Sequence, residues 1–215
     1  MYTILFSGGL DSTVCLALLK PFVRNLTALF FRYGQTNVER ELEQVYRICT
    51  HLNVPLATME LSFMQQLAMS QLMNQSDSMP ISPNWIPLRN VLFITVGSMY
   101  AIKNGMTNVV IGATRATSDP TWVPTPDCTP EFLSKMEIAV NEALGREFHI
   151  NIIAPFAEVT KAHIIKLAKI IPGCWDLISF THSCYLNRDK PCGECEACHS
   201  RKIAFEEAGI SDPIV

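Results

Sequence analysis

The chain contains 215 residues, of which 48% are hydrophobic and 17% are charged, and its formal net charge is −3 at pH 7. This length fits one domain with a sizeable core, and the composition excludes a disordered chain, which would be poor in apolar residues. The mild negative charge provides no general attraction to nucleic acid or anionic membranes, and no apolar run approaches the roughly 18 residues of a membrane span. The first residues lack the basic region of a signal peptide, so we expect a cytoplasmic protein.

Short apolar runs alternate with helical patterns in the first half of the chain. Strands are predicted over residues 2–6, 26–33 and, more weakly, 54–61. A helix is predicted over residues 11–20, and the spacing of Leu42, Val45, Cys49 and Leu52 predicts a second amphipathic helix. Between Met64 and Asn90, three prolines exclude a long helix, so an irregular segment is expected there.

The second half continues the same alternation. Helices are predicted over residues 91–103, 131–144 and 160–171, and strands over residues 108–112 and 150–153. A loop rich in Thr and Pro, residues 113–130, is too long for a simple connector, and such loops are usually functional or disordered. The tail after Gly173 reads as a cysteine-rich module.

Strands that alternate with helices indicate a parallel sheet, because parallel strands need crossover connections. The predicted fold class is therefore α/β, with a doubly wound, Rossmann-like parallel sheet of five strands. We expect residues 1–172 to form the α/β domain and residues 173–215 to form a C-terminal module packed on it. Ligands of such sheets bind at the carboxyl ends of the strands, near the switch in strand order.

A glycine-rich loop, Ser-Gly-Gly-Leu-Asp-Ser over residues 7–12, joins the first predicted strand to the first helix. Two glycines allow a sharp turn, and the following helix N-terminus offers unpaired N–H groups that suit phosphate. The loop has neither the Lys of a P-loop nor the third glycine of a dinucleotide fingerprint. An ordinary βα turn, capped by Asp11 or Ser12, is the alternative interpretation. The hexapeptide resembles the pyrophosphate-binding loop of the N-type ATP pyrophosphatases, in the adenine-nucleotide alpha-hydrolase-like superfamily.

Half of the eight cysteines crowd into the tail, and the other four, Cys15, Cys49, Cys128 and Cys174, are scattered. The clustered residues are Cys184, Cys192, Cys195 and Cys198. Four thiolates at this spacing indicate a tetrahedral zinc site, and a site closed by four cysteines is structural because it leaves no open position for water. Redox-active thiols and an iron–sulfur cluster are the alternatives.

With both motifs in one chain, the sequence resembles the 7-cyano-7-deazaguanine synthases, zinc-containing enzymes of queuosine-precursor biosynthesis, essentially from end to end. The matching elements are Tyr33-Gly34-Gln35 with Glu39, Ile86-Pro87-Leu88-Arg89-Asn90, Pro126-Asp127-Cys128 with Glu131-Phe132, Thr160-Lys161-Ala162, Ser183-Cys184-Tyr185, the Cys192 to Arg201 run and Asp212-Pro213. No single short element is decisive, but the collinear set is highly specific.

The resemblance implies an ATP-dependent carbon–nitrogen ligase that uses Mg²⁺ and Zn²⁺ and forms a homodimer. Such an enzyme adenylates 7-carboxy-7-deazaguanine, converts it with ammonia to the amide, and adenylates the amide oxygen to leave a nitrile, with release of AMP and pyrophosphate. The expected partners are these small molecules, and neither nucleic acid nor a membrane. The implied ATP-binding residues are Phe6, Ser7, Gly8, Gly9, Leu10, Asp11, Ser12 and Thr13. The implied catalytic residues are Ser7, Asp11, Ser12, Arg89 and Lys161, and the implied substrate-binding residues are Tyr33, Gln35, Arg89, Asn90 and Asp127.

Several of these roles have plain structural alternatives. Arg89 is expected to contact phosphate or the substrate carboxylate, and Lys161 to contact phosphate, although either could be an ordinary surface cation. Asp127 is expected to accept hydrogen bonds from the amino edge of the deazaguanine, or else to be a turn residue. Tyr33 and Gln35 either line the same pocket or provide ordinary packing at a strand end.

The chain departs from the family pattern around the expected substrate site. The run from Ser118 to Thr129 lacks the Ser-Gly-Tyr of the family and has Thr129 in place of an Arg, and Thr36-Asn37 stands where Arg-His is common. A paralogue that activates the same acid but stops at the amide, or transfers it to a protein N-terminus in a defence or modification system, is therefore the alternative. A zinc-ribbon binding module is a third hypothesis, but the tail lacks a dense basic patch.

Overall fold

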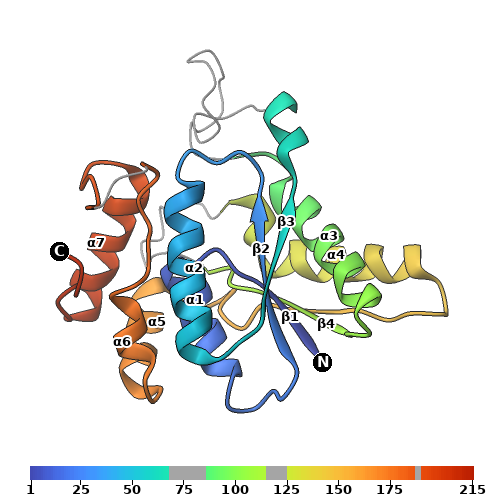
Figure 1. Ribbon diagram of the computed structural model, residues 1–215, viewed down its shortest axis with the longest axis horizontal. Helices are drawn as coiled ribbons and strands as arrows, with labels where there is room; N and C mark the ends of the chain where they lie inside the picture. The colour runs from blue at the N-terminus through green and yellow to red at the C-terminus, as the bar shows by residue number, and fades with distance from the viewer. Residues whose placement is uncertain (68–85, 115–124, 187–189) are drawn as a thin grey trace.

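The computed structural model describes residues 1–67, 86–114, 125–186 and 190–215, and these contain a five-stranded parallel sheet (Figure 1). Its strands are β1 (Tyr2–Leu5), β2 (Leu26–Arg32), β3 (Leu56–Glu60), β4 (Asn108–Ile111) and β5 (Asn151–Ile153). The strand order is β3-β2-β1-β4-β5, and every neighbouring pair is parallel. The predicted doubly wound, five-stranded α/β fold is therefore confirmed.

Helices cover both faces of the sheet, as Figure 1 shows. One face carries α1 (Leu10–Leu19), α2 (Val38–Leu52), α5 (Lys161–Ile170), α6 (Cys174–Ile178) and α7 (Glu196–Ala208). The other carries α3 (Arg89–Lys103) and α4 (Pro130–Leu144). Two 3-10 turns, η1 (Ser62–Leu67) and η3 (Pro126–Cys128), complete the regular structure of the described residues. No described helix combines the length and the apolar character that crossing a membrane would require.

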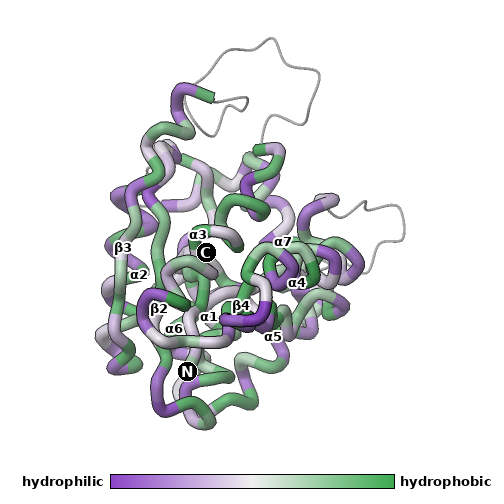
Figure 2. Tube along the Cα trace, turned by 90° about the vertical axis from the view of Figure 1, so that its right-hand side faces the viewer, coloured by the Kyte–Doolittle hydropathy of each residue, from purple (hydrophilic) through white to green (hydrophobic). Residues whose placement is uncertain are grey.

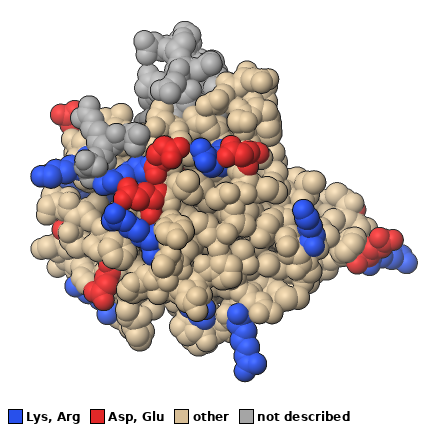
Figure 3. Space-filling view, in the orientation of Figure 1, with Lys and Arg blue, Asp and Glu red and all other residues tan. Residues whose placement is uncertain are grey.

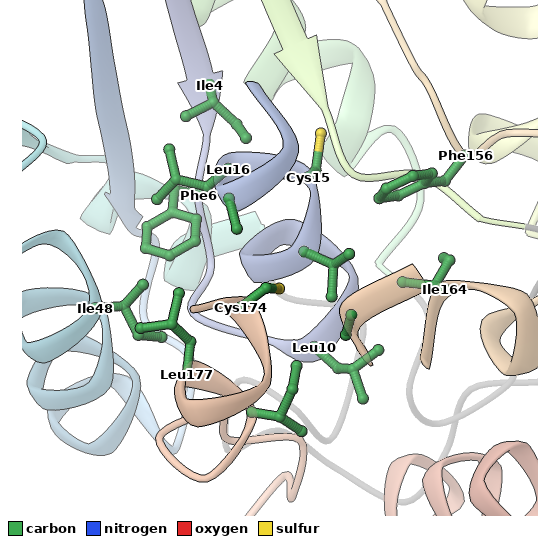
Figure 4. Packing of buried hydrophobic residues seen from close by; sticks show 14 of the residues in the cluster. Ile4, Phe6, Leu10, Cys15, Leu16, Ile48, Phe156, Ile164, Cys174 and Leu177 are labelled. Carbon is green, nitrogen blue, oxygen red and sulfur yellow. The ribbon is translucent and has the colours of Figure 1, made fainter. Parts of the chain in front are cut away.

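The side chains of the central strands point alternately to the two faces of the sheet, and this divides the hydrophobic core into two clusters. In β2, Ala28 and Phe30 pack on the α1 side, while Leu29 and Phe31 pack on the α3 side. This period of two is the strand geometry itself, because successive side chains of a strand point to opposite faces. Figure 4 shows the first cluster, in which Ile4, Leu16, Ile48, Ile164 and Leu177 from five elements meet.

The amphipathic pattern of α2 explains how that helix packs. Along its tube in Figure 2, hydrophilic and hydrophobic residues alternate, and its buried residues are Gln44, Val45, Ile48 and Cys49. Helix α2 thus presents one apolar stripe to the sheet and a charged stripe to solvent.

On the face of the molecule shown in Figure 3, positively and negatively charged side chains are interspersed.

The tail and the long loops differ most from the predicted elements. The tail contains two helices, α6 and α7, that the sequence patterns did not predict. Helix α3 begins at Arg89, two residues before its predicted start, and η3 occupies part of the predicted loop. Most of the segment expected to be irregular between Met64 and Asn90, and residues 115–124 of the Thr/Pro-rich loop, lie outside the described residues.

The switch in strand order lies between β1 and β4. The connection after β1 runs through α1 on one face, and the connection into β4 comes from α3 on the other. Their carboxyl ends approach closely, because a Cβ on Gly112, just after β4, would lie 3.0 Å from Ser12 Cα at the start of α1. In open α/β sheets this switch point is where ligands bind.

Helix α5 provides a matched test of the core. Ile164 is 0% exposed, whereas Ile170 on the same helix is 75% exposed. We expect Ile164→Ala to lower the free energy of unfolding by about 2–5 kcal/mol, because it removes buried methyl groups and leaves a cavity. Ile170→Ala should change it by less than about 0.5 kcal/mol. Urea unfolding of both variants measures the difference, and equal effects would contradict the packing described.

Candidate active site

The glycine loop after β1 folds in a way that requires glycine. Gly8 has a φ of +73°, in the left-handed region, and a Cβ there would lie 3.0 Å from Val45 Cγ2 of α2. Ser12 Oγ donates a hydrogen bond to the Gly9 carbonyl (3.1 Å) and lies 3.2 Å from Ser7 Oγ. The first N–H groups of α1 are therefore presented by a tight loop flanked by hydroxyls, which is an arrangement suited to phosphate.

Two predicted catalytic residues that are 150 positions apart in the chain form an ion pair beside this loop. Lys161 Nζ, at the first residue of α5, lies 3.2 Å from Asp11 Oδ2 at the start of α1, and both side chains are largely buried. The other oxygen, Asp11 Oδ1, is buried and has no hydrogen-bond partner in the described structure. An unpartnered buried carboxylate oxygen is costly without a ligand, so this atom is available to a cation or a donor.

A cavity of about 360 Å³ opens at the carboxyl ends of β1, β2 and β4. The predicted site residues that line it are Phe6, Ser7, Gly9, Leu10, Asp11, Ser12, Tyr33, Gln35, Arg89, Asn90 and Lys161. Of the other predicted residues, Gly8 and Thr13 support the loop from behind, since Gly8 packs on α2 and Thr13 is fully buried. The fold therefore brings most of the predicted site to one cavity at the switch point.

One wall of the cavity combines aromatic rings with a guanidinium group. The Phe31 and Phe93 rings stack with centroids 4.5 Å apart, and Tyr33 meets Phe93 edge-on at 5.3 Å. The Arg89 guanidinium carbon lies 5.9 Å from the centroids of both the Tyr33 and Phe93 rings. Arg89 Nε is buried without a partner among the described residues. This wall suits a planar ring that carries an anionic group.

The residue before Arg89 holds a strained backbone. Leu88 has a φ of +63°, which is rare for a residue with a Cβ, and its side chain is exposed. Asn90, the residue after Arg89, is fixed by Asp127, whose Oδ2 accepts from the Asn90 N–H (3.3 Å) and whose carbonyl accepts from Asn90 Nδ2 (3.1 Å). A strained backbone of this kind persists only where the surrounding contacts stabilise it. Here it directly precedes the first residues of α3, Arg89 and Asn90, which line the cavity.

Asp127 itself does not line the cavity. Its side chain is buried in η3, and its contacts hold the first turn of α3. Thr129, at the position where the family pattern has an Arg, caps α4 by accepting from the Phe132 N–H (3.2 Å). The altered run from residue 118 onward lies partly outside the described residues.

Glu41 is a cavity residue that the sequence analysis missed. Its Oε2 accepts from Gln35 Nε2 (3.0 Å), and its Oε1 accepts from Asn37 Nδ2 (3.2 Å). Burial raises the pKa of the Glu41 carboxyl to about 7, against the lowering effect of the Gln35 hydrogen bond. The sequence analysis instead singled out Glu39, whose side chain is 66% exposed and pairs with Arg32. The available signal was helical spacing, because residue 41 shares the apolar face that contains Val45, Ile48 and Leu52.

The four clustered cysteines form a compact candidate metal centre. All four Sγ atoms lie within 4.8 Å of one another, and Cys192 Sγ is 3.9 Å from Cys198 Sγ. A tetrahedral zinc site with bonds of about 2.3 Å places its sulfurs about 3.8 Å apart, so the spacing fits a single ion. Hydrogen bonds from the Cys195 and Glu194 backbone N–H groups lower the pKa of the Cys192 thiol to about 6. The cluster is therefore consistent with zinc.

The segment that leads into this centre also covers the cavity. His182, Ser183 and Tyr185 line the cavity, and the His182 N–H donates to the Gly8 carbonyl (3.3 Å). The carbonyls of Cys184 and Tyr185 accept from Asn37 Nδ2 (2.9 Å) and Thr36 Oγ1 (2.8 Å). The residues 36 and 37 that depart from the family pattern thus bind the metal-binding segment to the start of α2.

A buried arginine fixes the same segment from the other side. Arg201 of α7 is 3% exposed and forms a bidentate ion pair with Asp212, at 2.6 and 2.9 Å. Its Nη1 also donates to Thr181 Oγ1 (2.8 Å) and to Ser183 Oγ (3.2 Å). Because Arg201 donates hydrogen bonds to Thr181 and Ser183 and is itself paired with Asp212, it anchors the segment between α6 and the candidate metal centre.

Comparisons with known proteins agree with these features. The model of a family described as "Queuosine biosynthesis protein QueC" matches residues 2–209. The chain is 31% identical over 220 residues to a 7-cyano-7-deazaguanine synthase of a Nitratiruptor species, covering 98% of this chain and 96% of that protein. It is 32% identical over 221 residues to the 7-cyano-7-deazaguanine synthase of Oceanobacillus iheyensis, with coverage of 98% and 96%. Among solved structures, an NMN synthetase from Francisella tularensis is similar with a TM-score of 0.53 at 14% identity, over 98% of this chain and 77% of that one.

The metal centre yields a direct prediction. Cys195→Ser should reduce the zinc content of the purified protein from stoichiometric to trace, because three thiolates hold the ion far less tightly and Cys195 is the N-cap of α7. Solubility should fall with the metal. Inductively coupled plasma mass spectrometry measures the metal content. Cys128→Ser, which changes a half-buried cysteine outside the cluster, should keep its zinc, and a soluble, metal-loaded Cys195→Ser protein would contradict the assignment.

Proposed function

The chain belongs to the family of queuosine biosynthesis protein QueC, the 7-cyano-7-deazaguanine synthases, and we propose that its cavity binds ATP beside 7-carboxy-7-deazaguanine and adenylates the carboxylate of that acid. One observation carries this assignment to the cavity. Two buried, unpartnered atoms of opposite charge, Asp11 Oδ1 and Arg89 Nε, belong to residues that line the same cavity as the glycine loop. A site that activates an acid with ATP needs an anionic group to hold the cation bound to the phosphates and a cationic group to hold the carboxylate of the acid. Asp11 and Arg89 are the groups suited to these two tasks.

The proposed position of ATP follows from the loop. The phosphates would accept from the first N–H groups of α1 and from the hydroxyls of Ser7 and Ser12. The ammonium of Lys161 would offset charge on the leaving pyrophosphate, while its ion pair with Asp11 holds it at the loop. Mg²⁺ bound with ATP would neutralise further phosphate charge, and Asp11 Oδ1 is the group suited to hold it.

The acid is proposed to bind against the aromatic wall. Its planar ring would pack on Tyr33 and Phe93, and its carboxylate would accept from Arg89. A carboxylate oxygen then forms a bond to the α-phosphorus of ATP as the bond to pyrophosphate breaks. Holding both reactants in one cavity makes this step effectively unimolecular, which is a large part of its acceleration.

Two further transfers complete the proposed sequence. Ammonia forms a C–N bond to the acyl carbon, and AMP leaves with the electron pair of the broken C–O bond. The amide oxygen then attacks a second ATP, pyrophosphate leaves, and loss of AMP together with the remaining N–H protons gives the nitrile. None of the four clustered cysteines lines the cavity, so we assign the proposed zinc a structural role.

The product identifies the reaction. Purified protein incubated with ATP, Mg²⁺, ammonium and 7-carboxy-7-deazaguanine should form the nitrile, with two ATP converted to AMP and pyrophosphate per nitrile. Mass spectrometry of the small molecules and of the intact protein measures this outcome. A stable amide, or an adduct on a protein amine, would contradict the proposal and support an amide-forming paralogue.

A variant tests whether the glycine loop performs the chemistry. Asp11→Ala should lower acid-dependent pyrophosphate release by about a hundredfold or more, because it removes charge positioned for the transition state. Its circular dichroism spectrum should match the parent protein. Asp176→Ala, which removes an exposed carboxylate on α6, should leave the rate unchanged. Full activity of Asp11→Ala would refute the placement of ATP.

A further inference from the structure

Glu41 is a partly buried carboxylate that the proposed adenylation step does not use. It lies on α2 directly behind the glycine loop, since its carbonyl oxygen is 3.5 Å from the position that a Cβ on Gly8 would occupy. Its side chain enters the cavity from that side and is held by the amides of Gln35 and Asn37. Each carboxylate oxygen therefore has one amide donor and retains acceptor capacity for a ligand.

The charge of Glu41 has no bonded cation among the described residues. Besides Glu41, the titratable and charged side chains that line the same cavity are Tyr33 just after β2, Arg89 of α3, Asp11 of α1, Cys128 of η3, Lys161 of α5, and His182 and Tyr185 of the segment 181–185. Of the cations, Lys161 is paired with Asp11, and Arg89 contacts Tyr33 Oη at 3.5 Å. A carboxylate that is largely removed from water and has no bonded cation is unfavourable, so a small cationic ligand beside the partly buried Glu41 would stabilise the site.

We infer that Glu41 forms the ammonium-binding subsite of this enzyme and accepts the proton that converts ammonium to the attacking ammonia. This inference rests on the proposed function, because it concerns the second step of that sequence. One proton passes from NH₄⁺ to the Glu41 carboxylate, and the freed lone pair forms the C–N bond to the acyl adenylate. The C–O bond to AMP breaks, AMP leaves with that electron pair, and a second N–H proton is lost to solvent as the amide forms.

The position and charge of Glu41 favour ammonium over a neutral donor edge of the deazaguanine ring. A ring N–H edge would satisfy the free acceptor sites but would leave the negative charge without a bonded cation, offset only by the Coulombic effect of Arg89. Glu41 also lies beside the glycine loop, where the α-phosphate and the acyl carbon would meet, whereas a base edge must lie a ring's width from the carboxylate. A proton acceptor works best when its pKa is near the operating pH, and burial raises that of Glu41 to about 7.

The experiment separates the adenylation step from the ammonia step. Glu41→Gln is compared with the parent protein and with Glu39→Gln, which changes an exposed glutamate one half-turn away on the same helix. Three rates are measured: acid-dependent exchange of pyrophosphate into ATP, amide formation from ammonium, and hydroxamate formation from hydroxylamine. Hydroxylamine is uncharged at neutral pH and needs no deprotonation before it attacks.

For Glu41→Gln we expect kcat/KM for ammonium at pH 7 to fall by about a hundredfold. Pyrophosphate exchange and hydroxamate formation should stay within about threefold of the parent protein. In the parent protein, kcat/KM for total ammonia should level off above about pH 7, where Glu41 is ionised. In the variant it should keep rising tenfold per pH unit, because only free ammonia then reacts. Glu39→Gln should behave as the parent protein does.

Other outcomes overturn the inference. An equal loss with ammonium and hydroxylamine, or an unchanged pH profile, would show that Glu41 takes no proton. If Glu41→Gln loses the acid-dependent exchange of pyrophosphate into ATP and raises KM for the acid, Glu41 binds the deazaguanine ring instead. If Glu41→Gln does not fold, Glu41→Asp keeps the charge and shortens its reach, and it should raise KM for ammonium while exchange persists; an unchanged KM would refute the subsite. Absence of exchange in the parent protein would contradict the proposed function separately from this inference.

Discussion

The backbone hydrogen bond from the His182 N–H to the Gly8 carbonyl joins the metal-binding segment to the glycine loop, and the geometry of the cavity depends on it. On one side of this bond, Gly8 packs against Val45 with a left-handed backbone, where any side chain would be strained. On the other side, the segment 181–185 is hydrogen-bonded to Arg201 and contains Cys184 of the candidate metal centre. The four-cysteine cluster is therefore connected to the site through backbone hydrogen bonds, although its sulfurs are not part of the cavity wall.

The cavity is also organised by charge. Asp11 and Lys161 neutralise each other at the loop, while Arg89 and Glu41 face the interior without an ion pair in the described structure. Buried charges of this kind are costly unless they are compensated, and substrates that carry a carboxylate and an ammonium group compensate both. The same two charges would make the cavity selective for an acid together with an ammonium ion, because a neutral ligand in either place would leave one charge without a partner. Asn37 belongs to this arrangement, since it connects Glu41 to the Cys184 carbonyl.

Local patterns were sufficient to predict the sheet, most helices and the two motifs, because strand alternation, helical spacing and the glycine loop are properties of short segments. They were not sufficient for features that depend on tertiary packing. Glu41 was missed because its neighbour Glu39 matched a motif, and only the packing of α2 shows which of the two faces the cavity. Asp127 was expected in the pocket, yet its hydrogen bonds to Asn90 hold the start of α3. Helix α6 escaped prediction because its five residues are too few to show a helical period, and α7 because the segment was assigned to the metal site through Cys195 and Cys198.

The metal centre should hold the glycine loop and the start of α2 in place through the segment 181–185. Hydrogen exchange of the metal-loaded protein, compared with the same protein after chelation, tests this coupling most directly. We expect removal of the metal to accelerate exchange in residues 7–13 and 36–45 as well as in residues 181–201, because opening the segment releases the hydrogen bonds at Gly8, Thr36 and Asn37. Faster exchange confined to residues 181–201, with the loop and α2 unchanged, would contradict the coupling.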